Sequence, residues 1–86
     1  MTKKFFVIEA HDLNEIYNEK TKKYEYKKIG KHALVDTYAE PSDLMNCIMF
    51  DSMKNAKHFV EKHYGDKKDP RFIAAKPKVV TYVREE

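Results

Sequence analysis

The feature that most constrains the fold is an apolar run near the N-terminus, KFFVIEA at residues 4–10. It is rich in aromatic and β-branched residues and too short for a helix, so it predicts a strand. Successive side chains of a strand point to opposite faces, which puts Phe5 and Val7 together on one face. Phe6 and Ile8 share the other face. Because both faces are apolar, the run predicts a central strand of a sheet.

A helix is predicted over residues 52–64. Its apolar side chains recur at helical spacing, Asp51 is a suitable N-cap, and Gly65 is a natural stop. The apolar residues are Met53, Ala56, Phe59, Val60 and Tyr64. A helix with one apolar stripe covers one face of a sheet.

A hairpin is predicted around Gly30-Lys31. Residues 22–29 and 32–38 flank this pair, and a two-residue connection that begins with glycine is typical of a type II′ turn. With the turn at this place, alternation puts Tyr24 and Tyr26 on the core face of the hairpin.

Weaker patterns complete the chain. They predict a loop or irregular strand that starts at residue 11, ends at Tyr17 and turns near residues 18–21. They also predict a short apolar strand over 46–50, a charged loop over 65–76 and a closing strand over 78–84. Since typical domains have roughly 100 to 150 residues, residues 1–86 form a single domain. The predicted fold is a small two-layer α+β fold. Its largely antiparallel sheet has four or five strands, with the amphipathic helix packed on one face.

Lysines are concentrated between residues 20 and 31, where six of them surround two tyrosines. Exposed aromatic rings beside cations bind nucleic acid by stacking, whereas tyrosines on the core side leave an ordinary solvated hairpin. Alternation favours the solvated hairpin, and the formal net charge of +3 permits nucleic acid without requiring it. The candidate nucleic-acid contacts, in the hairpin and on the helix, are Lys22, Lys23, Lys27, Lys28, Lys31, Lys54, Lys57 and Lys62.

One helix covers only one face of the sheet, so the sequence has an apolar surplus. The candidate protein interface on the other face consists of Phe5, Val7, Leu34 and Tyr38. Exposed apolar patches of this kind mark partner surfaces. The alternative is that the loops at residues 11–21 and 66–76 fold over this face, and the sequence leaves both outcomes open.

Catalytic, cofactor and metal motifs are not visible in the sequence. His58 and His63 are five residues apart, whereas helical metal-binding pairs are three or four apart. Cys47 is the single cysteine and cannot form an internal disulfide, which is typical of a reducing compartment. No segment approaches the ~20 apolar residues of a membrane span. We therefore expect a cytoplasmic, non-enzymatic protein without a cofactor and without membrane contact.

Two segments resemble a known module. KKIGK at residues 27–31, followed by FDSMKNAKHFVEK at 50–62, resembles the strand, turn, strand and helix order of the WGR domain, which is linked to nucleic-acid binding. The resemblance covers about half of the chain. The defining tryptophan is absent, and the Trp-Gly-Arg positions fall at or near Tyr26, Lys27 and Lys28, which keep only aromatic and basic character. The short, lysine-rich chain is also similar in style to small phage-encoded accessory proteins.

The leading expectation is a protein-binding module that acts through an uncovered apolar sheet face or a sheet edge, toward a second copy or another protein. The alternative is a weak, mainly electrostatic nucleic-acid-binding module that uses the hairpin and helix lysines. Burial of Tyr24 and Tyr26 decides whether the hairpin lies on the sheet or projects from it.

Overall fold

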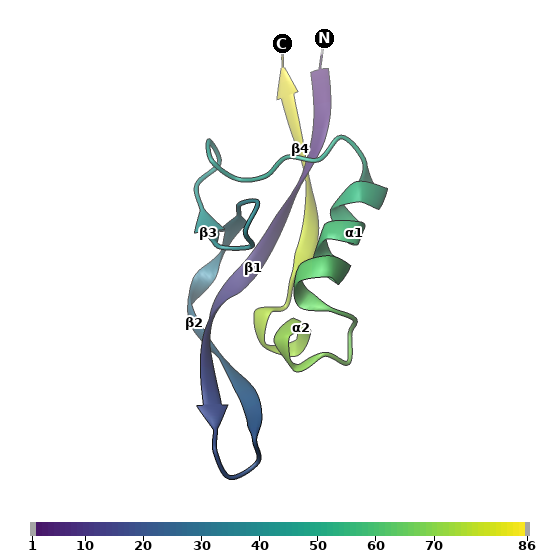
Figure 1. The fold of residues 1–86 in the computed structure, drawn as a ribbon. Coiled ribbons are helices and arrows are strands. Elements are labelled where there is room, and N and C mark those ends of the chain that lie inside the picture. The colour runs from purple at the N-terminus through teal and green to yellow at the C-terminus, as the bar shows by residue number, and fades with distance from the viewer. Residues whose placement is uncertain (1, 86) are drawn as a thin grey trace.

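Four antiparallel strands and two helices make up the fold in a computed structural model, which describes residues 2–85 (Figure 1). The strands are β1 (Thr2–Asn18), β2 (Lys23–Val35), β3 (Pro41–Ser42) and β4 (Lys78–Glu85), and the helices are α1 (Met53–Tyr64) and α2 (Pro70–Ala75). The strand order is β3-β2-β1-β4. The predicted α+β fold with one amphipathic helix on a largely antiparallel sheet is confirmed.

The strand β1 is the centre of the sheet, as the apolar run at residues 4–10 predicted. Its first half pairs with β4 and its second half with β2, so one long strand joins both ends of the molecule. It continues through the polar segment to Asn18, where the chain turns. The Asn18 side chain accepts hydrogen bonds from the backbone N–H groups of Lys20 (2.9 Å) and Thr21 (3.3 Å), an arrangement that favours a tight turn.

The predicted turn at Gly30-Lys31 is wrong, because this pair forms a bulge within the continuous strand β2. The β1–β2 register places His32 opposite His11 but Ile29 opposite Asp12, which leaves the two residues between them without partners on β1. Gly30 has φ +67, a conformation that suits glycine in a bulge as well as in a turn. The hairpin turn lies instead at residues 19–22.

One face of the sheet is covered by both helices. The core here contains Ile8, Ala10, Val35, Phe59, Val60, Tyr64 and Ala75. Helix α1 thus buries the predicted apolar stripe except for Met53, which is exposed. Ser52 is the N-cap of α1 in place of Asp51, since its Oγ accepts from the backbone N–H of Asn55 at 3.2 Å. At the other end, the Gly65 N–H donates to the Glu61 carbonyl at 3.0 Å, as expected for a stop at glycine.

The segment 43–50 covers part of the opposite face. It places Cys47 against Phe5 and Val7, beside the half-buried Leu34, Val80 and Tyr82. The predicted strand over residues 46–50 is absent from this segment and is replaced by a single bridge, in which Phe6 and Phe50 exchange two backbone hydrogen bonds. Asp43 explains the difference, because its carboxylate and carbonyl accept from the backbone of Asn46 and hold the segment in a turn.

The molecule is elongated, with extents of 57 × 23 × 15 Å. In Figure 1 the β1–β2 hairpin extends beyond both helices at one end, and the two termini lie together at the other end. The predicted charged loop over residues 65–76 contains the short helix α2, which Asp69 caps and Pro70 begins. Neither helix among residues 2–85 is long and apolar enough to cross a membrane.

Candidate functional site

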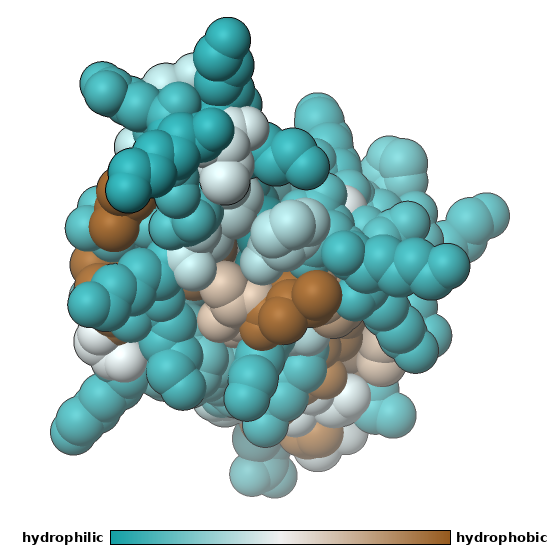
Figure 2. Space-filling view, turned by 90° about the horizontal axis from the view of Figure 1, so that it is seen from below, coloured by the Kyte–Doolittle hydropathy of each residue, from teal (hydrophilic) through white to brown (hydrophobic). Residues whose placement is uncertain are grey.

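The hairpin from residue 14 to residue 31 is named the arm; its tip projects beyond the helices, and its base lies beside α2. It comprises the end of β1, the turn and the first part of β2 with its bulge. Figure 2, seen from the arm end, shows a mostly hydrophilic surface in which apolar side chains form small, separate patches. Near the turn the two strands have no covering layer, so both of their faces are in contact with solvent.

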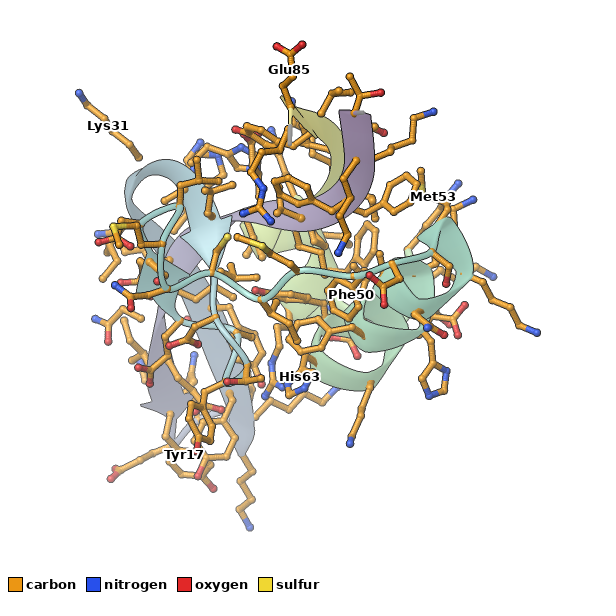
Figure 3. The ribbon with its side chains drawn as sticks, turned by 90° about the horizontal axis from the view of Figure 1, so that it is seen from above. Tyr17, Lys31, Phe50, Met53, His63 and Glu85 are labelled. Carbon is orange, nitrogen blue, oxygen red and sulfur yellow. The ribbon has the colours of Figure 1, made fainter. Side chains whose placement is uncertain are left out.

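The arm carries the whole formal charge of the chain. It holds six lysines and three glutamates, a net charge of +3, while the remaining eleven basic and eleven acidic side chains cancel. The lysines lie in the turn, on β2 or in its bulge, and the β1 side of the arm, residues 14–18, has none. In Figure 3 the labelled Lys31 points away from the body of the molecule. The positive charge therefore gathers along one side of the arm.

Two tyrosines lie exposed near the tip of the arm. Tyr17 and Tyr24 are directly opposite each other, and their ring centroids are 5.1 Å apart with the planes tilted by 58°. Their exposed fractions are 49% and 56%. The prediction that Tyr24 belongs to the core is wrong, since the turn at residues 19–22 carries this part of β2 beyond the reach of the helices.

Tyr26 anchors the base of the arm. Its hydroxyl donates to Glu15 Oε1 (3.2 Å) and accepts from Arg71 Nη2 (3.2 Å). The other guanidinium nitrogen, Nη1, donates to the His63 carbonyl (3.1 Å), and the guanidinium lies 5.1 Å from the centre of the Tyr26 ring. The Tyr26 hydroxyl raises the pKa of Arg71. These contacts tie the half-buried Tyr26 to α2, so only the part of the arm beyond it projects freely.

The predicted nucleic-acid contacts fall into two groups. Five of them are in the arm: Lys22, Lys23, Lys27, Lys28 and Lys31. The other three, Lys54, Lys57 and Lys62, are exposed on α1, whose neighbours are β1, β4 and α2. The structure therefore places Lys22, Lys23 and Lys27 within three residues of the exposed Tyr24, Lys28 and Lys31 at the base of the arm, and the helix lysines on another element.

The predicted protein interface does not form one exposed patch. Phe5 and Val7 are buried, with Val7 at 0% exposure, and Leu34 is half-buried. Tyr38 alone of the four is strongly exposed, at 80%. The cover on this face comes from residues 43–50, whereas the sequence alternative expected it from residues 11–21 and 66–76. The apolar surplus is thus largely satisfied within the chain.

Histidines and a cysteine form small polar features outside the arm. The rings of His11 and His32 are 4.8 Å apart, and His32 Nδ1 lies 3.4 Å from the Glu9 carboxylate. Burial and the neighbouring His32 lower the pKa of His11. The buried Cys47 thiol donates to the Leu44 carbonyl at 3.3 Å, and burial raises its pKa. Among residues 2–85, no group of three or more His, Cys, Asp or Glu side chains is placed to hold a metal ion.

Comparison with models of protein families, with curated proteins and with solved structures finds no match.

Two residues of the arm site were missed by the sequence analysis. Tyr17 was predicted at the end of an irregular strand, before a turn near residues 18–21, but its pairing with Tyr24 across that turn was not predicted because the hairpin turn was assigned to Gly30-Lys31. Arg71 was assigned to a charged loop, and nothing in the sequence links it to Tyr26, from which it is 45 positions distant. Its role depends on the packing of α2 against β2.

Proposed function

We propose that the protein is a non-enzymatic binding module that holds single-stranded nucleic acid along its arm. One observation carries this proposal: two half-exposed tyrosine rings lie near the tip of an arm whose six lysines and three glutamates give a net charge of +3. Bases stack on exposed aromatic rings, and lysines beside them bind the phosphates.

The layout of the arm favours a single strand over a duplex. Tyr17 and Tyr24 share one face of the arm, so their rings offer a surface to unpaired bases. Lys23 and Lys27 lie on the opposite face of β2 from Tyr24, but a flexible lysine side chain can reach phosphates around the edge of a two-stranded arm. Bases in a duplex are already stacked on one another and are not available to the rings.

Protein binding through the sheet face that carries Phe5 and Val7 is less well supported, because both side chains are buried. The arm is accessible without any rearrangement of the chain. Contacts to phosphates also make the binding sensitive to salt.

The proposal is tested by fluorescence-anisotropy titration of labelled single-stranded DNA, single-stranded RNA and duplex DNA of equal length. We expect the single strands to bind more tightly than the duplex. Tyr24→Ala should weaken single-strand binding by about 5- to 150-fold, the range that corresponds to the ~1 to 3 kcal/mol of one stacked base.

Tyr38→Ala is the matched control. Tyr38 is even more exposed than Tyr24 but lies outside the arm, in the connection between β2 and β3. Its removal should leave the affinity unchanged. Equal losses for the two variants, or no binding by the wild-type protein at low salt, would reject the proposal.

A further inference from the structure

The outer edge of β4 is an open strand edge. β4 is the last strand in the order β3-β2-β1-β4, and no described strand pairs with its outer side. Its eight residues contain no proline, which would block pairing, and Val83 on it is 62% exposed. Open edges of this kind are templates for pairing with another strand.

The bridge between Phe6 and Phe50 fixes which backbone groups point outward from β4. Phe6 donates to Phe50 at 2.9 Å and accepts from it at 2.8 Å, so both backbone groups of Phe6 point away from β4. The Phe6–Thr81 pair in the β1–β4 register is therefore not hydrogen-bonded. The N–H and C=O of Thr81, and by alternation those of Val79 and Val83, face the open edge.

A groove accompanies this edge on the helix side. It has a volume of about 550 Å³ and lies between α1 and the start of β4. Among its lining residues are Met53, Val60, Phe72 and Val79. An apolar side chain that arrives beside Val79 would thus find a partly apolar site.

We propose that two copies of the chain pair through this edge, with β4 antiparallel to β4. The two-fold axis passes at Thr81, so Thr81 faces the same residue of the second copy, and Val79 faces the second copy's Val83. Val83 of the second copy, the most exposed apolar side chain of β4, then lies at the groove beside Val79. The two-fold symmetry places Val83 of the first copy in the same way at the groove of the second copy. On the other face, Val80 meets the second copy's Tyr82.

Other features of the chain agree with a second copy as the occupant of the edge. Because the pairing is antiparallel and β4 lies at the opposite side of the sheet from β3, the two arms point to opposite ends without colliding. One pair is unfavourable, since Lys78 lies opposite the second copy's Arg84. The Glu9 carboxylate, 3.6 Å from Lys78 Nζ, offsets this repulsion.

The test is the mass of the protein in solution, by sedimentation equilibrium from roughly 1 µM to 1 mM, the range suited to a small interface. We expect a monomer–dimer equilibrium. Thr81→Pro removes the outward N–H from both copies and should raise the dissociation constant roughly tenfold or more, whereas Thr81→Val keeps the N–H and the dimer. Circular dichroism verifies that the variants are folded.

Two further variants test the same pairing of β4 with β4. If Thr81→Pro does not fold, Val83→Lys takes its place, because it puts a charge opposite Val79 and should also give a monomer. Oxidation of Thr81→Cys should give a disulfide-linked dimer, since facing residues of a ladder lie within disulfide reach, whereas Val83→Cys should not. A wild-type protein that stays monomeric, or a folded Thr81→Pro variant that dimerises like the wild type, overturns the proposal. Neither outcome bears on nucleic-acid binding by the arm.

Discussion

Replacement of Gly65 by alanine should destabilise the protein far more than the same replacement at Gly30. Both glycines have positive φ, +80 and +67, so alanine is strained at either position. At Gly65 an added Cβ would also lie 2.8 Å from Cγ and 2.9 Å from Cβ of Asp69, whereas at Gly30 nothing lies within 4 Å. Gly65 therefore combines backbone strain with steric overlap, whereas Gly30 has backbone strain alone.

The magnitude follows from the two contributions. A residue held in a sparsely populated backbone region costs about 1 to 3 kcal/mol. Asp69 caps α2 by accepting from the Arg71 N–H at 2.9 Å, and loss of an N-cap costs about 0.5 to 2 kcal/mol. We expect about 2 to 4 kcal/mol for Gly65→Ala, and about 1 kcal/mol for Gly30→Ala, where only the strain acts.

Equilibrium unfolding in urea, followed by circular dichroism, measures both losses as changes in the free energy of unfolding. The double variant Gly65→Ala with Asp69→Gly removes the side chain that the added Cβ would overlap, and glycine is tolerated at an N-cap, so this variant should recover part of the loss. Equal losses for Gly65→Ala and Gly30→Ala would refute the reasoning. A double variant whose loss of unfolding free energy equals or exceeds the sum of the two single losses would also refute it.

Three further predictions concern the core, the pH dependence and the arm. Ile8→Ala should lower the free energy of unfolding by about 2 to 5 kcal/mol in urea titrations, because Ile8 is fully buried. Burial lowers the pKa of His11 and His63, so the unfolded chain binds more protons than the folded one below pH 6.5. Stability should therefore be complete above pH 6.5 and fall as the pH drops below it, as urea unfolding between about pH 5 and 8 would measure. Tyr26→Phe removes the hydroxyl that joins Glu15 to Arg71 and should speed hydrogen exchange in the arm while the core stays protected.

The centre of the fold could be predicted because two strong periodicities determine it. Alternation with both faces apolar identified the central strand at Phe5 to Ile8, and helical spacing with a following Gly65 identified α1. These patterns depend on local sequence and on burial, and the structure agrees with both. Even there the cap moved by one residue, from Asp51 to Ser52, because either side chain is suitable and only the local geometry decides.

The position of the hairpin could not be predicted from Gly30. A glycine with positive φ serves a turn or a bulge equally well, and the choice depends on how far β1 continues. Because of this ambiguity, Tyr24 was predicted in the core, whereas it lies exposed on the arm. The candidate lysines were identified by position, but their gathering on one side of an arm followed only from the register.

The cover over Phe5 and Val7 could not be predicted either, because it depends on a long-range contact. Cys47 reaches them from a segment whose apolar residues indicated a strand, and a turn held by Asp43 directs that segment across the sheet. An apolar surplus in the sequence therefore did not correspond to an open surface.

The most direct test of nucleic-acid binding by the arm is the salt dependence of binding to single-stranded DNA in two charge-matched variants. One variant replaces Lys22, Lys23 and Lys27 by glutamine, and the other replaces Lys54, Lys57 and Lys62 on α1. If the three arm lysines each contact a phosphate, their removal should reduce the slope of log affinity against log salt by about 2, at ~0.7 per contact. The helix variant should keep the wild-type slope. Equal slopes in the two variants, or a loss confined to the helix variant, would contradict binding through the arm.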